Sequence, residues 1–249
     1  MGITLFTNNA FSSVSDPDEY SPGFDVTSLR RAEIFTYTGI GKNLMPGEGG
    51  PTVVGSPTFI TDSPFVEFSN NANVAHLNLG IKDTDQQTWF LLFDPNNDST
   101  QRMIAGSFSG ITASAPPGVS VIVDESGALS FTQGVHYTDT DTYGTMRAIL
   151  SLFNKTKPML LCFTLDGQTT RLTDMTNNVS ASLTLAESRG RAPATIRVGK
   201  GGATWGSQSA VSRIGAYMVF DRVLSDAEKS TVHDYLLSCI QAKFPTIIF

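Results

Sequence analysis

The closing stretch of the chain, residues 211–240, most constrains what this sequence can fold into. Its first part, residues 214–220, is an apolar run with β-branched and aromatic side chains, which favours a buried strand. Ser225 and Glu228 then have the spacing of a capping box, in which each side chain accepts a hydrogen bond from the other residue's backbone N–H. Apolar residues recur at helical spacing after it, so the sequence predicts a closing helix at about 225–242 with one apolar face.

The middle of the chain alternates short apolar runs with turn sequences. Residues 88–94, TWFLLFD, are apolar at odd and even positions and predict a central strand covered on both faces. The DESG turn after residues 119–123 and the Asp-Gly pair after residues 159–165 each predict a β-hairpin. The sequence therefore predicts an all-β fold, a two-sheet antiparallel jelly-roll sandwich with one short C-terminal helix and an N-terminal arm.

The N-terminal region differs in composition from the rest. It opens with a short apolar run and turn sequences, and residues 25–38 could form a short helix or an irregular strand, of which we favour the helix. Residues 39–57 are dense in Gly and Pro and predict a long connector. We therefore divide the chain into an N-terminal arm with its connector, residues 1–50, and a jelly-roll domain, residues 51–249.

The closing stretch also resembles a known family. The string RIGAYMVFDRVLSDAEKSTVHDYL is similar to the final strand and closing helix of laminin-G-like domains in the concanavalin A-like lectin/glucanase superfamily. The segments SPTFITDSPFVEFSNNANVAHLNL and TWFLLFDP resemble the opening strands of that family. The resemblance implies a concanavalin A-like jelly roll. It implies little about activity, because this superfamily contains sugar binders, hydrolases and structural modules.

Charge and hydropathy limit the partners of the chain. It has 17 Lys and Arg against 23 Asp and Glu, a formal net charge of −6, and no basic cluster, so nucleic acid is not an expected partner. No apolar stretch approaches the ~18 residues of a membrane-spanning helix, so we expect no membrane insertion. The start of the chain lacks a basic region followed by an apolar one, so we expect no signal peptide. Cys162 and Cys239 lie in apolar surroundings and are expected to be free buried thiols rather than a disulfide.

The sequence lacks the motifs of the enzymes that share this fold. Glycosidases that resemble laminarinases place two glutamates on one face of a strand, in a Glu-x-Asp-x-Glu pattern. Here Glu67, Glu125, Glu187 and Glu228 each stand alone. The nearest nucleophile-elbow pattern, GSFSG, has Phe108 where the serine is needed. We therefore expect no catalytic residues and no enzyme activity, and a hydrolase with a rearranged acid pair is the alternative.

Two groups of residues suggest a binding site. Asp94, Asn96 and Asp98 in FDPNNDS present oxygen ligands of the kind that calcium takes, although an ordinary turn explains the same residues and is favoured. No other cofactor is expected. Trp205, in the loop GKGGATWGSQS, and Tyr143, beside two aspartates, are the candidates for ligand binding, because sugar rings stack on exposed aromatic side chains. A packing role is an equal alternative for Trp205.

Together these patterns favour a non-enzymatic structural or adhesion module of a larger assembly. The opening residues are similar to those of virion and tail proteins of tailed bacteriophages, which implies a place in the virion, as capsid decoration or tail component, after assembly in the bacterial cytoplasm. The expected partners are other virion or assembly proteins, in a homo-oligomer or hetero-assembly built by exchange of the N-terminal arm. The alternative function is a lectin-like carbohydrate-binding module for cell-surface glycans, assisted by calcium.

Overall fold

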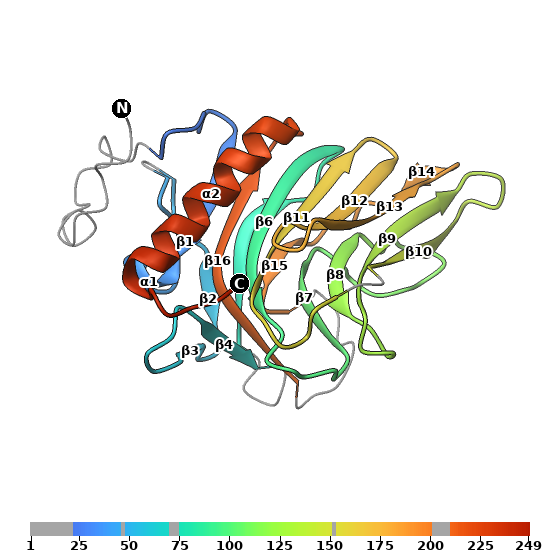
Figure 1. Cartoon of the computed structure of the whole chain (residues 1–249). Helices are drawn as coiled ribbons and strands as arrows, with labels where there is room; N and C mark the ends of the chain where they lie inside the picture. The colour runs from blue at the N-terminus through green and yellow to red at the C-terminus, as the bar shows by residue number, and fades with distance from the viewer. Residues whose placement is uncertain (1–21, 46–47, 70–74, 151–152, 201–209) are drawn as a thin grey trace.

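The protein is a sandwich of two antiparallel β-sheets, with a helix across the outer face of one sheet (Figure 1). The computed structural model describes residues 22–45, 48–69, 75–150, 153–200 and 210–249. Within these residues every pair of neighbouring strands is antiparallel. The predicted all-β sandwich with a C-terminal helix is therefore confirmed.

The first sheet, which we call sheet A, carries many of the largest buried side chains. Its strands are β1 (Leu29–Ile34), β3 (Thr58–Phe59), β4 (Val66–Ser69), β6 (Gln86–Asp94), β11 (Met159–Asp166), β12 (Thr169–Asp174), β13 (Val179–Thr184) and β16 (Val211–Phe220). The order is β13-β12-β11-β6-β16-β4-β3, and β1 also pairs with β16. The Asp-Gly hairpin that the sequence predicts joins β11 to β12.

The strands of the second sheet, which we call sheet B, carry fewer of the largest buried side chains. They are β2 (Thr52–Val54), β5 (His76–Lys82), β7 (Arg102–Gly106), β8 (Val119–Val123), β9 (Leu129–Tyr137), β10 (Thr142–Leu150), β14 (Ser188–Arg189) and β15 (Thr195–Val198). The order is β10-β9-β8-β7-β15-β5-β2, and β14 pairs with β9. The DESG turn connects β8 to β9, which confirms the second predicted hairpin.

Strand β6 lies in the middle of sheet A, between β11 and β16. Successive side chains of a strand point to opposite faces. Trp89 and Leu91 accordingly pack in the core between the two sheets, whereas Phe90 and Leu92 pack in a second apolar layer on the other side. The prediction of a central strand covered on both faces is confirmed, and Trp89 within it is buried.

The closing helix α2 (Asp226–Lys243) forms the second apolar layer with the outer face of sheet A (Figure 1). Its buried side chains include Val232, Leu236 and Ile240. Ser225 caps the first turn: its hydroxyl accepts from the backbone N–H of Glu228 at 3.3 Å, and the Glu228 carboxylate accepts from the N–H of Ser225 at 2.8 Å. The predicted capping box is therefore confirmed. No helix in the described part of the chain is long and apolar enough to cross a membrane.

The short helix expected over residues 25–38 is wrong for most of that range. Residues 29–34 form β1, which pairs with β16, and only α1 (Phe35–Thr38) is helical. Pairing with β16 places Ala32 and Ile34 in the apolar layer under α2, and this long-range contact outweighs the local preference. Sheet A thus begins upstream of residue 51. The division of the chain at that residue stays a prediction, and residues 1–21 of the expected arm lie outside the described residues.

The two cysteines are free and buried, as expected. Both belong to the apolar layer between sheet A and α2. Burial raises the pKa of the Cys162 thiol to about 11 and that of the Cys239 thiol to about 12. Because the thiolate is the reactive form, both residues act as apolar packing groups at neutral pH.

A buried carboxyl group lies where β1 joins the sandwich. Glu33 is fully buried and lies opposite Tyr217 in the register of β1 and β16. Its carboxylate accepts a hydrogen bond from the backbone N–H of Lys42. Burial nevertheless raises the pKa of Glu33 from its ordinary value of 4.5 to about 8, so the folded protein holds this side chain neutral at and below neutral pH.

Removal of the N-cap hydroxyl tests the role of the capping box. We expect Ser225→Ala to lower the free energy of unfolding by about 1 kcal/mol, because one N–H of the first turn loses its acceptor. The control is Ser230→Ala at an exposed position inside α2, where alanine raises helix propensity and stability changes by at most a few tenths of a kcal/mol. Urea unfolding measures both. Equal stability of the two variants would contradict the assigned cap.

The pH dependence of stability tests the buried carboxyl group. The folded state raises the pKa of Glu33, so its contribution is complete below about pH 4.5 and is lost as the pH rises through about 8. The slope is at most about 1.4 kcal/mol per pH unit. We expect Glu33→Gln to remove this pH-dependent contribution to stability. The free energy of unfolding of the wild type should therefore fall, relative to that of the variant, as the pH rises between those two values. Urea unfolding at a series of pH values measures the difference, and parallel curves would refute it.

Candidate functional site

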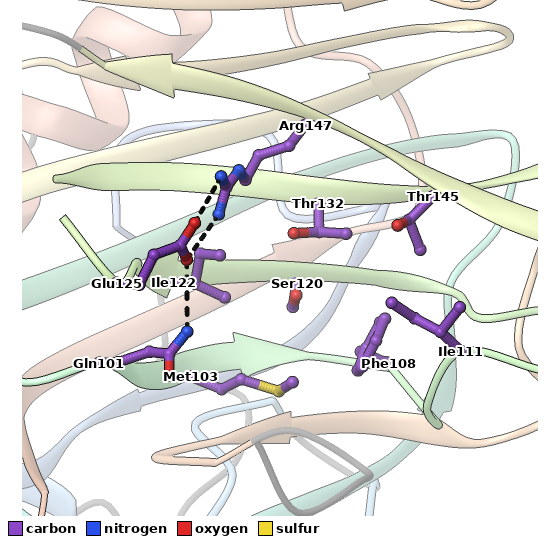
Figure 2. Close-up of a pocket in the computed structure, with 10 residues that line it drawn as sticks. All are labelled: Gln101, Met103, Phe108, Ile111, Ser120, Ile122, Glu125, Thr132, Thr145 and Arg147. Carbon is purple, nitrogen blue, oxygen red and sulfur yellow. Dashed lines mark hydrogen bonds and ion pairs between the residues drawn. The ribbon is translucent and has the colours of Figure 1, made fainter. Parts of the chain in front are cut away.

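The outer face of sheet B, which is turned away from the core, carries a pocket of about 380 Å³. Val119, Val121 and Val123 of β8 face the core, so the residues between them face outward. We call this cavity the sheet B pocket. It is lined by residues of four neighbouring strands and the loops beside them, namely Gln101, Met103, Phe108, Ile111, Ser120, Ile122, Glu125, Thr132, Thr145 and Arg147 (Figure 2).

The register of three strands places polar side chains in a row across the pocket. Ser120 of β8 lies opposite Thr132 of β9, and Thr132 lies opposite Arg147 of β10. Directly opposite residues of antiparallel strands share a face of the sheet, with Cβ atoms about 4.5–5.5 Å apart. Three residues that are distant in the sequence therefore point into one cavity.

The floor of the pocket is apolar. Met103, Phe108 and Ile122 form a hydrophobic cluster that is separate from the two main layers of the core. Ile111, from the loop between β7 and β8, is 62% exposed and lies beside Phe108 at one end of the pocket (Figure 2). A ligand that enters this pocket would contact apolar surface on the sheet and on the loop.

The opposite end of the pocket is polar and charged (Figure 2). Arg147 donates two parallel hydrogen bonds to Glu125, at 3.0 and 2.9 Å, and Gln101 donates to the same carboxylate at 3.3 Å. These bonds favour the ionised form, and the Arg147 guanidinium lowers the pKa of Glu125 to about 2. The Asp124 carboxylate also lies 3.9 Å from Nη1 of Arg147. Two acidic groups thus lie beside one basic group.

A buried hydroxyl group lies between these two ends. Ser120 is only 1% exposed, and its Oγ has no hydrogen-bond partner among the described residues. Figure 2 shows it between the charged end and the Phe108 end of the pocket. An unpartnered buried hydroxyl is destabilising by about 1–3 kcal/mol, so a polar ligand atom that reaches it would make a favourable hydrogen bond.

The predicted ligand-binding residue Tyr143 lies on the same outer face but outside the pocket lining. Its ring stacks on His136, with centroids 4.6 Å apart and an interplanar angle of 20°, so one face of the ring is covered. Its backbone N–H donates to the carbonyl of Ala113, in the loop that also carries Ile111. Ligand binding by Tyr143 stays a prediction. Trp205 lies outside the described residues.

The predicted calcium ligands form a turn after β6. The Asp94 carboxylate accepts from the backbone N–H of Asn96 at 2.8 Å, and Asn96 has a positive φ of 52°. Asp98 accepts in the same way from the N–H of Thr100 at 2.8 Å. These are turn contacts of aspartate side chains, which supports the interpretation as a turn.

A guanidinium group occupies the centre of this turn. Arg102 is fully buried, and its Nη1 lies 3.3 Å from the Asp98 carboxylate. It also donates to the carbonyl oxygens of Pro95, Asp98 and Thr100. The cation that these oxygens bind is therefore a side chain of the same protein. In the described ranges no group of three or more His, Cys, Asp or Glu residues is arranged to hold a metal ion. Calcium binding stays the less favoured alternative to this turn.

A second cavity, of about 250 Å³, lies between sheet A and α2. Its charged side chains already have partners. Lys229 pairs with Asp226 at 3.2 Å, and Arg171 donates to the Ser180 hydroxyl at 3.0 Å. We therefore take the sheet B pocket, with its unpartnered hydroxyl, as the candidate functional site.

The pocket has no clear signature in the sequence. From the sequence alone, Glu125 is an isolated glutamate and Phe108 a residue unsuited to a nucleophile position. One signal was present in β8, VSVIV, because Ile122 is apolar at a position that alternation turns away from the core. An apolar residue on an outer face indicates a surface that something else contacts.

Comparisons with known proteins reveal the fold but no family. No protein family model matches the chain, and no curated protein matches it. The binding domain of botulinum neurotoxin DC in complex with SialylT is 10% identical, with a TM-score of 0.54 over 84% of this chain and 52% of that one. The enzymatically active domain of bacteriophage CBA120 tailspike protein 2 is 13% identical, with a TM-score of 0.53 over 75% of this chain and 30% of that one.

The botulinum neurotoxin serotype D binding domain is 13% identical, with a TM-score of 0.50 over 74% of this chain and 46% of that one. This chain thus spans about half or less of the length of each of these structures. At such low identity the likeness concerns the β-sandwich alone.

Replacement of the buried arginine tests the turn after β6. We expect Arg102→Met to lower the free energy of unfolding by about 3–5 kcal/mol, because it leaves several buried acceptors without a donor. The control is Arg191→Met, which removes an exposed ion pair with Asp85 and should change stability by at most about 1 kcal/mol. Urea unfolding measures both.

We also expect calcium to leave the melting temperature of the wild type unchanged. A rise in the melting temperature with calcium would support the metal site instead.

Proposed function

We propose that this chain is a non-enzymatic adhesion module that binds carbohydrate in the sheet B pocket. The composition of the pocket carries the proposal. It combines an apolar floor of Met103, Phe108 and Ile122 with polar groups that point into the same cavity. Sugars present apolar C–H faces and hydroxyl edges, and small-molecule sites match such ligands with apolar walls and a few placed polar groups.

The state of Glu125 supports binding rather than hydrolysis. A retaining glycosidase needs two carboxyl groups about 5–5.5 Å apart, one of which keeps a proton at working pH. Glu125 is the one acidic side chain among the described residues that line the pocket, and Arg147 lowers its pKa to about 2. It is therefore ionised at neutral pH and accepts hydrogen bonds. Asp124, next to it, accepts hydrogen bonds from Ser126 and Ala128 of its own turn.

The similar structures support an adhesion role in a larger particle. Two of them are described as a binding domain in complex with SialylT and as the enzymatically active domain of a bacteriophage tailspike protein. The first supports a binding role, and the second supports a place in a phage tail. The sequence resemblance to laminin-G-like domains is consistent with the same sandwich. We infer a concanavalin A-like jelly roll that serves in a bacteriophage virion, as a tail or capsid-decoration component, with other virion proteins as partners and cell-surface glycans as ligand.

Substitution of the unpartnered hydroxyl tests the site. We expect the wild type to bind glycans on an array, and we expect Ser120→Ala to bind the best of them about three- to tenfold more weakly, the value of one or two hydrogen bonds. The same variant should be more stable by about 1 kcal/mol, because a buried hydroxyl without a partner is removed. Isothermal titration calorimetry and urea unfolding measure the two effects.

A matched control is available on the neighbouring strand. Ser130 of β9 is also fully buried, and its hydroxyl also lacks a partner within the described ranges, but it does not line the pocket. Ser130→Ala should gain similar stability and keep wild-type affinity. A wild type that binds no glycan on the array, or a Ser120→Ala variant with unchanged affinity, would contradict the proposed function.

A further inference from the structure

The charges of the sheet B pocket argue against an acidic ligand. Of the described residues that line it, Arg147 is the one that carries a positive charge. Both of its terminal nitrogens donate to Glu125, and Asp124 lies 3.9 Å from it. A sugar carboxylate or sulfate would therefore have to displace Glu125 and would approach two acidic groups. An uncharged ligand avoids this repulsion.

The apolar end of the pocket argues against a sugar that carries hydroxyls alone. Phe108 and Ile111 lie side by side at this end, and Met103 contributes to the same floor (Figure 2). A hydroxyl group that is desolvated against these side chains loses its hydrogen bonds to water without a replacement. A methyl group placed there is bound favourably, because its apolar surface is removed from water.

A small group with a methyl at one end and hydrogen-bonding atoms at the other matches both features. The unpartnered Ser120 hydroxyl lies between the charged end and the apolar end (Figure 2), and Thr132 lies opposite it in the strand register. An acetamido group presents a methyl, a carbonyl acceptor and an N–H donor within one planar unit. The Ser120 hydroxyl can donate to that carbonyl or accept from that N–H.

We propose that the sheet B pocket selects an uncharged N-acetylhexosamine. This inference rests on the proposed function and specifies its ligand class. The acetamido methyl packs on Phe108 and Ile111, the amide hydrogen-bonds to Ser120, and ring hydroxyls donate to Glu125 at the charged end. The volume of about 380 Å³ is near the lower limit of the ~300–1,000 Å³ of drug-sized ligand pockets, which suits a mono- or disaccharide.

Matched pairs of sugars test the selection on the full chain. The ligands are the methyl glycosides of N-acetylglucosamine and glucose, those of N-acetylgalactosamine and galactose, and a sialylated trisaccharide as the acidic arm. Isothermal titration calorimetry measures each affinity. We expect at least one N-acetylated sugar to bind about tenfold or more tightly than its hydroxyl counterpart, and more tightly than the acidic ligand.

Two isoleucines provide the variant and its control. Ile111→Ser removes the apolar wall at a 62% exposed position, so the variant should fold and should lose most of the preference for the N-acetylated member of the pair. Ile149 is 48% exposed on β10 but does not line the pocket, and Ile149→Ser should keep the preference. An unchanged affinity ratio in Ile111→Ser would overturn the assignment of the methyl group to this end.

The outcomes separate this inference from the proposed function. If glycans bind but the acidic or unsubstituted sugars bind as tightly as their N-acetylated counterparts, the selection is refuted while carbohydrate binding by the pocket stands. If no sugar binds in the titrations and none binds on the array, both the inference and the proposed function fail.

Discussion

The burial of sheet A on both faces is the constraint on which the rest of the structure depends. Its central strand β6 places Trp89 and Leu91 in the core and Phe90 and Leu92 on the other side. So many large apolar side chains cannot remain in water on the second face. Helix α2 covers them, and β1 extends the same layer. The outer face of sheet A is therefore used for stability, which leaves the outer face of sheet B available for binding.

In sheet B, apolar and polar side chains are distributed differently over the two faces. Its inward positions in β8 are valines, whereas its outward positions include Ser120 and Ile122. No helix in the described residues packs on this face (Figure 1). A small apolar cluster and a hydroxyl without a partner, all of them buried, therefore line a pocket on this face. Such an uncompensated polar group reduces stability unless a ligand or water satisfies it. This imbalance is what distinguishes the pocket from an ordinary part of the sandwich.

Arginine side chains hold the loops at the ends of the strands. Arg102 binds the turn after β6 through carbonyl oxygens, and Arg147 joins β10 to the turn between β8 and β9 through Glu125. In each case the positive charge is matched by acidic or carbonyl groups of the protein. The arginine charges near the candidate site thus have structural partners, so the recognition that we propose there rests on hydrogen bonding and apolar contact rather than on net charge.

Several elements could be predicted from the sequence because short-range interactions decide them. Residues three apart make the capping box of Ser225 and Glu228, turn residues make the two hairpins, and alternation within one segment makes β6 a covered strand. Only the tertiary structure decided that residues 29–34 form a strand, that Arg102 fills the turn after β6, and that Ser120, Thr132 and Arg147 share a pocket. These features depend on strand register and on contacts between side chains of separate elements, and no local pattern in the chain encodes them.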